Sequence, residues 1–228
     1  MALHEVKAVL FDLDDTLIDW WGSLTTTLGR VAHDEDAEAL LEHVRSRFWE
    51  RHPEHDFVWH RNTWQLFEDR RTAWREVLTH LHPADLDTLI RRFEDDLWVG
   101  YFPDAVPTLD RLTDRTRLAV LSNNHLIDRE AKRLRLHDWF EFAMCPKDCF
   151  KPTPEAFHQA CVRLGLAAHD VAYVGDSVRA DALGALDAGL VPIWVDRWND
   201  PWHERPNDIT RVGSLSEIPD LLGIPAFD

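Results

Sequence analysis

Acidic side chains follow two of the apolar segments of this chain, at the points where those segments end. Asp12 and Asp14 come directly after the first apolar segment, and Asp176 and Asp181 follow a later one. Clustered carboxylates repel one another, so a bound cation or a proton must neutralise part of their charge. Ligand sets made only of oxygen favour Mg²⁺, which pairs with one or two carboxylates and a substrate phosphate. The four acids therefore predict a magnesium site.

Three further residues could act on an anionic group beside such a site. Ser122 and Asn123 end another apolar segment, and Lys151 precedes a helical pattern that begins near Pro154. Phosphoryl transfer depends mostly on positioning and on stabilisation of charge, for which a metal ion and one lysine are suited. We therefore expect Ser122 and Lys151 to take part in the chemistry.

The pair Asp12 and Asp14 could supply both a nucleophile and an acid. A carboxylate is a competent covalent nucleophile toward phosphate and divides one difficult step into two. Two positions along a strand, Asp14 returns to the same side as Asp12. Asp14 is then within reach of the leaving group, and an acid-rich pocket can raise its pKa toward neutrality.

A parallel sheet would bring these residues together. After Pro103 short apolar runs alternate with helical patterns, which predicts a doubly wound parallel α/β sheet. Ligands bind beyond the carboxyl ends of the strands in such a sheet, where the residues named above stand. The predicted strands are 6–11, 118–121, 140–144, 171–174 and 191–195, and the predicted helices are 126–136, 154–164 and 178–188.

Residues 20–98 show only helical periodicity. One apolar stripe runs from Ala37 to Phe48, and another follows Pro83, which suits the first position of a helix. This helical block interrupts the α/β pattern just after its first strand. We therefore predict an α/β domain made of 1–17 and 100–228, and an all-helical domain at 18–99.

The motifs resemble the four-motif set of the haloacid dehalogenase-like (HAD) superfamily. They are Asp12–Thr16, Ser122, Lys151-Pro152, and Gly175–Ser177 with Asp181, and the resemblance covers roughly residues 5–17 and 100–220. The helical insert is similar to the all-helical cap of the phosphoglycolate-phosphatase-like branch. The resemblance implies a Rossmann-like core, Mg²⁺ as cofactor and a small phosphorylated metabolite as substrate.

The resemblance also implies a role for each motif position. Asp12 would form an aspartyl-phosphate, with one of its oxygens on Mg²⁺. Asp14 would protonate the leaving oxygen and then activate water, and its backbone carbonyl would touch the metal. Ser122 would bind a phosphoryl oxygen together with the backbone N–H of Asn123, and Lys151 would neutralise the nucleophile and the transferring group.

By the same resemblance Asp176 would be a metal ligand, and Asp181 a ligand or a partner behind it. The chain departs from the family pattern at two positions. A glycine is common three residues before the motif lysine, where this chain has Asp148, and an asparagine often precedes the last motif aspartate, where it has Ala180. Lys147 is an alternative for the lysine role.

The helical insert is rich in tryptophan and arginine. These residues could form a lid that stacks a ring and binds a second anionic group. We prefer the interpretation in which most of the indoles fill a small core and the arginines are solvated. Trp20 and Trp21 are exceptions, because the segment after the first motif should overhang the pocket, and we predict that they contact the substrate.

Composition excludes several partners. The formal net charge of −16 disfavours binding to nucleic acids and to anionic membranes. No stretch approaches the roughly 20 consecutive apolar residues of a membrane span. Cys145, Cys149 and Cys161 are expected to be reduced thiols. We therefore expect a cytoplasmic protein, as a monomer or a homodimer.

Four functions are compatible with parts of this pattern. The first is a phosphatase acting on a small-molecule phosphate monoester. A phosphomutase or phosphotransferase would pass the phosphoryl group to a sugar instead of water. A haloacid dehalogenase would need neither the acid at Asp14 nor a metal ligand at Asp176, and a non-catalytic phosphate-binding module would need neither Asp12 nor Asp14. We therefore predict the phosphatase.

Overall fold

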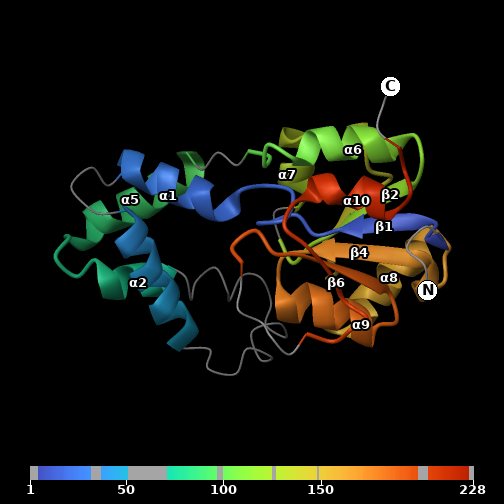
Figure 1. Ribbon diagram of the computed structural model, residues 1–228. Helices are drawn as coiled ribbons and strands as arrows, with labels where there is room; N and C mark the ends of the chain where they lie inside the picture. The colour runs from blue at the N-terminus through green and yellow to red at the C-terminus, as the bar shows by residue number, and fades with distance from the viewer. Residues whose placement is uncertain are drawn as a thin grey trace. The chain divides into compact units, whose positions relative to one another are not determined.

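The computed structural model describes residues 5–31, 37–50, 71–96, 100–124, 127–147, 149–199 and 205–225. The chain forms two compact units (Figure 1). The α/β unit consists of Met1–Ile18 and Tyr101–Asp228, and the helical unit consists of Asp19–Gly100.

Six parallel strands form the sheet of the α/β unit, in the order β3-β2-β1-β4-β5-β6. Their bounds are β1 Ala8–Phe11, β2 Arg117–Leu121, β3 Ala143–Met144, β4 Val171–Gly175, β5 Val191–Val195 and β6 Thr210–Val212. The sheet proceeds from β1 in both directions, and β1 pairs with β2 on one side and with β4 on the other. This arrangement confirms the predicted doubly wound parallel sheet.

Helices cover both faces of the sheet, which is why its central strands are apolar throughout. They are α6 Ala105–Thr113, α7 Ile127–Arg133, α8 Pro154–Leu164, α9 Gly184–Asp187 and α10 Ile218–Leu221. Figure 1 shows α6 and α10 on one face, and α8 and α9 on the other. Ala8 and Leu10 pack with Phe157 of α8 in one buried cluster, while Phe11 meets Phe140 edge to face. Alternate residues of β1 therefore face opposite layers.

Several elements differ from the predicted ones. Helix α6 and strand β6 were not predicted, and β6 has only three residues, too few for a periodic pattern. The predicted strand 140–144 is shorter in the structure, at Ala143–Met144, and begins later because the Phe140 N–H still donates to the Leu136 carbonyl in the preceding turn. The predicted helix 178–188 opens with a wider turn, η4 (Val178–Leu183), before α9.

The helical unit contains α1 (Trp20–Val31), α2 (Ala37–Glu50), α5 (Pro83–Asp96) and a helical segment at 71–77. Pro83 occupies the first position of α5, as predicted. Leu40, Leu41 and Val44 of the predicted stripe are buried in the apolar cluster of this unit, and the side chain of Phe48 lies outside the described residues. No helix in the described ranges is long and apolar enough to cross a bilayer.

Candidate active site

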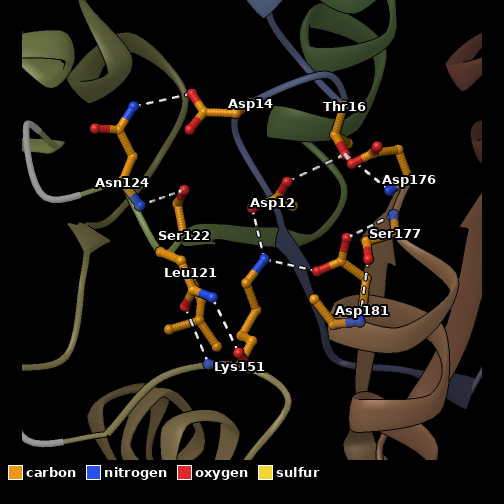
Figure 2. Close-up of polar contacts among 12 residues, drawn as sticks. Asp12, Asp14, Thr16, Leu121, Ser122, Asn124, Lys151, Asp176, Ser177 and Asp181 are labelled. Carbon is orange, nitrogen blue, oxygen red and sulfur yellow. Dashed lines mark hydrogen bonds and ion pairs between the residues drawn. The ribbon is translucent and has the colours of Figure 1, made fainter. Parts of the chain in front are cut away.

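The carboxyl ends of β1, β2 and β4 meet at one edge of the sheet, because these strands are parallel neighbours. Asp12 follows β1, and its N–H donates to the Val174 carbonyl at 2.8 Å, which continues the pairing with β4 by one residue. Ser122 follows β2, and Asp176 follows β4. Figure 2 shows these side chains around Lys151.

Lys151 lies at the centre of the site, and its side chain is almost completely buried. Its Nζ donates to Asp12 Oδ1 at 2.6 Å, to Asp181 Oδ1 at 2.6 Å and to the Tyr173 hydroxyl at 2.7 Å. An ammonium group has three N–H donors, so all of them are used. Burial by itself would lower the pKa of Lys151, but the neighbouring carboxylates of Asp12 and Asp181 raise it, and the side chain stays charged.

The backbone of Lys151 is held from β2. The side-chain amide of Asn123 donates to the Lys151 carbonyl at 3.0 Å and accepts from the Lys151 N–H at 3.0 Å. This pair of hydrogen bonds resembles the pairing of two strands, and it places the loop that contains Lys151 against the end of β2. Asn123 was predicted to act through its own backbone N–H, whereas its side chain has this positioning contact.

A threonine hydroxyl links the acids of β1 and β4. Thr16 Oγ1 accepts from the Asp176 N–H at 3.0 Å and lies 3.2 Å from Asp176 Oδ1 and 3.4 Å from Asp12 Oδ2. Thr16 belongs to the first motif, but no role was predicted for it. The two oxygens of Asp12 are therefore in different surroundings, because Oδ1 meets Lys151 and Oδ2 faces Thr16.

Asp181 approaches the site from η4, one turn after β4. Its Oδ2 accepts from the Ser177 N–H at 2.9 Å, and its Oδ1 accepts from Lys151. Ser177 caps the turn by accepting from the Ala180 N–H at 3.1 Å. Only glycine fits at position 175, because a Cβ there would lie 2.4 Å from Asp181 Cγ.

The acids fit a divalent cation. One carboxylate oxygen from each of Asp12, Asp176 and Asp181 lies within 4.8 Å of the others, and a donor set made only of oxygen suits Mg²⁺. Burial, followed by the charges of Asp181 and Asp12, raises the pKa of Asp176 well above its usual value. Burial also raises the pKa of Asp12 to about 6, although Lys151 opposes the shift. The single ammonium group therefore leaves negative charge that a metal ion could neutralise.

Asp14 lies outside this group of three acids and has a different environment. The side-chain amide of Asn124 donates to its Oδ1 at 2.9 Å, and the Asn124 N–H donates to Ser122 Oγ at 3.1 Å. Burial and the charge of Asp12 raise the pKa of Asp14 to about 7, which suits proton transfer near neutral pH. Asn124 was not predicted, and its only signal in the sequence was its place in the polar run that follows β2.

An ion pair near the site holds the loop that follows β1. Arg197 makes two bonds to the Asp104 carboxylate, at 2.9 and 3.0 Å, and one to the Thr16 carbonyl at 2.8 Å. Asp104 also accepts from Ser214 Oγ at 2.7 Å and from the Leu215 N–H at 3.0 Å. Burial would raise the pKa of Asp104, but the bonds from Arg197 and Ser214 lower it.

Three other candidates from the sequence are Lys147, Trp20 and Trp21. Lys147 is exposed, so the lysine buried among the acids is Lys151. Trp20 and Trp21 belong to α1 of the helical unit, where Trp21 packs against the apolar cluster. Their contact with a substrate stays a prediction, and Asp148 lies outside the described residues.

A buried lysine between acids at the carboxyl ends of parallel strands is the arrangement of an enzyme active site. Comparison with known proteins gives the class. The profile of a hydrolase family, haloacid dehalogenase-like hydrolase, matches residues 6–189. The chain belongs to the haloacid dehalogenase-like hydrolases, which confirms the resemblance seen in its motifs.

Individual relatives cover nearly the whole chain. Phosphoserine phosphatase of Thermus thermophilus is 38% identical over 243 aligned positions, which cover 93% of this chain and 98% of the relative. Human N-acylneuraminate-9-phosphatase is 26% identical over 249 positions, with 97% and 96% covered. The crystal structure of a 2-haloacid dehalogenase from Pseudomonas syringae pv. Tomato DC3000 is 29% identical with a TM-score of 0.67, and covers 96% of this chain and 98% of its own.

Proposed function

We propose that this chain is a magnesium-dependent phosphatase that hydrolyses a small-molecule phosphate monoester through an aspartyl-phosphate on Asp12. The observation that carries the proposal is that Asp12 and Asp14 lie in different surroundings. Asp12 is bonded to Lys151, whereas Asp14 is bonded to Asn124 and has a pKa raised to about 7. A nucleophile must be ionised and a leaving-group acid must hold a proton, and these environments favour that division.

The proposed reaction uses both acids. The Asp12 carboxylate attacks phosphorus, the bond from phosphorus to the leaving oxygen breaks, and Asp14 gives its proton to that oxygen. Asp14, now ionised, accepts a proton from water, whose oxygen attacks phosphorus and displaces Asp12. Inorganic phosphate leaves, and both acids return to their starting states.

Lys151 and Ser122 assist by holding charge in place. The Lys151 ammonium group neutralises Asp12 and the transferring group. Ser122 Oγ already accepts from the Asn124 N–H, so its own proton can be donated to a phosphoryl oxygen. The backbone N–H of Asn123 is proposed as a second donor. Preorganised donors of this kind lower the barrier because they need not reorient as charge develops.

Asp12 and Asp176 are the acids proposed to hold Mg²⁺ directly, with the Asp14 carbonyl as a further ligand. Asp181 is proposed as a further ligand or as a partner behind them, where its oxygens accept from Lys151 and from the Ser177 N–H. When bound, the cation would supply charge stabilisation for the phosphoryl oxygens and orient the substrate.

The substrate is proposed to be a small phosphorylated metabolite, in keeping with relatives named as phosphatases of N-acylneuraminate 9-phosphate and phosphoserine. We propose that the α/β unit carries the reaction and that the helical unit is the cap, with Trp20 and Trp21 as substrate contacts. The cytoplasm is the proposed location.

A panel of phosphorylated metabolites, assayed with and without Mg²⁺, tests this function. We expect phosphate release that depends on Mg²⁺ and stops when a chelator is added. Chloride release from 2-chloropropionate without a metal, and no phosphate release, would instead indicate a dehalogenase. Transfer of the phosphoryl group to a sugar, detected by product analysis, would indicate a phosphotransferase or phosphomutase.

A further inference from the structure

Tyr173 lies on the central strand β4 with its hydroxyl group at the base of the site. The side chain is buried, and its ring meets Phe157 of α8 edge to face, with 4.9 Å between the ring centroids. The hydroxyl oxygen lies 2.7 Å from Lys151 Nζ, 2.9 Å from the Leu121 carbonyl oxygen and 3.2 Å from Asp181 Oδ1. Strand and helix together therefore fix the position of a polar group that the proposed reaction has not used.

The directions of these hydrogen bonds can be worked out. A lysine ammonium group only donates, so the Tyr173 oxygen must accept from Lys151. The one phenolic proton is then available to the nearer acceptor, the carbonyl of Leu121. Burial and the charges of Asp181 and Asp12 raise the pKa of Tyr173, which keeps this proton in place. The bonds form a continuous path from the backbone of β2 through Tyr173 to Lys151 and Asp12.

We propose that Tyr173 is a positioning residue of this site, whose hydroxyl group accepts a hydrogen bond from the third ammonium N–H and holds Lys151 between Asp12 and Asp181. The inference rests on the proposed function. Without the hydroxyl group, one N–H of the buried Lys151 ammonium group loses its hydrogen-bond partner, which is energetically costly for a buried charged group. The ammonium group then shifts from its place and holds Asp12 Oδ1 less well. Attack on phosphorus slows, while Ser122 and the backbone N–H of Asn123, the proposed donors to the phosphoryl oxygens, keep their places.

The test compares two tyrosine variants. Tyr173→Phe keeps the ring and its packing on Phe157 and removes only the hydroxyl group. Tyr101→Phe is the matched control, because the Tyr101 hydroxyl also donates to a backbone carbonyl, that of Leu134, at 2.8 Å. With p-nitrophenyl phosphate and Mg²⁺, we expect kcat of Tyr173→Phe to fall about 10- to 100-fold with KM unchanged, and kcat of the control to stay the same.

A second measurement does not depend on turnover. In protein labelled with ¹⁵N-lysine, the buried Lys151 should give a slowly exchanging ammonium signal with a cross-peak to the Tyr173 ring, unlike the exposed Lys7, Lys132 and Lys147. Tyr173→Phe should speed that exchange. If the variant does not fold, the wild-type cross-peak still decides whether the contact exists.

Two results would overturn the proposal. One is a Tyr173→Phe enzyme that unfolds at a lower temperature but keeps the kcat of the wild type, since that is a purely structural role. The other is a wild-type protein without a protected Lys151 signal. A wild-type enzyme that releases no phosphate from any substrate would overturn the proposed function, and the ammonium signal would still report separately on Tyr173.

Discussion

Gly175 offers the sharpest test of how closely the site is packed. A methyl group at this position would lie 2.4 Å from Asp181 Cγ and 2.5 Å from both Asp181 Cβ and Oδ2. Carbon atoms pack at roughly 3.5 Å or more, so Asp181 must retreat by about 1 Å. Its bond of 2.6 Å to Lys151 would then lengthen beyond the usual limit for a hydrogen bond. Gly175→Ala should therefore disrupt the site without removing any charged group.

The expected cost has two parts. Overpacking a well-packed region costs about 1–3 kcal/mol, and loss of a hydrogen bond between charged groups costs about 1.5–3 kcal/mol. The free energy of unfolding should therefore fall by about 2.5–6 kcal/mol. Mg²⁺-dependent hydrolysis of p-nitrophenyl phosphate should also decrease, because Lys151 loses one of the acids that hold it beside Asp12.

Urea-induced unfolding would measure the cost, with Gly213→Ala as the matched control. A Cβ at Gly213 has its nearest neighbour at 3.7 Å, which is an ordinary contact. Asp181→Gly provides a second background, since it removes the carboxylate and the Cβ that the new methyl group would meet. In that background Gly175→Ala should cost less than about 1 kcal/mol, a strong departure from additivity.

The reasoning would be refuted by either of two results. Gly175→Ala could prove as stable as the Gly213→Ala control, which would mean that Asp181 does not lie over residue 175. Alternatively, the cost could be the same with and without the Asp181 side chain, which would place its origin elsewhere.

Three further predictions concern charge. Asp12→Asn and Asp14→Asn should each lower kcat by about 10²–10⁴-fold or more, and circular dichroism should show that both variants fold. Near-normal turnover by either variant would remove that residue from its proposed role. Because the folded-state pKa of Asp12, Asp14 and Asp176 is raised, the metal-free protein should gain stability as pH falls from about 8 to 6. Mg²⁺ at about 100 times its Kd should stabilise the protein by about 2.7 kcal/mol. Because protons compete with the metal for these acids, the rise in Tm on adding Mg²⁺ should be larger at about pH 8 than at pH 6. Equal rises in Tm at the two pH values would contradict metal binding by these acids. Asp104→Asn should lower the free energy of unfolding by about 1–3 kcal/mol at pH 7 through loss of the charge beside Arg197. Because the folded-state pKa of Asp104 is lowered, its contribution to stability exists above the unfolded-state pKa of about 4 and disappears at lower pH. The difference in the free energy of urea unfolding between wild type and Asp104→Asn should therefore shrink below that pH. A difference that stays constant with pH would contradict this prediction.

The sequence was sufficient for the elements that have a local signal. Strands β1 and β4 are buried on both faces, so they appear as continuous apolar runs, and the acids that follow them were recognisable as a group. The order of strands and helices predicted a parallel sheet, and a parallel sheet brings its strand ends to one edge. Asp12, Lys151, Asp176 and Asp181 could therefore be expected together before any distance was known.

Only the tertiary structure identified the partners of these residues. Tyr173 belongs to an apolar strand and would be taken for a core residue, yet its hydroxyl group meets a lysine 22 residues away and a carbonyl 52 residues away. Asn124 meets Asp14 across 110 residues, and Thr16 meets Asp176 across 160. Local periodicity carries no record of such pairs, because they arise when separate strands are brought side by side. Their pKa shifts have the same origin, since burial and neighbouring charge exist only once the chain has folded.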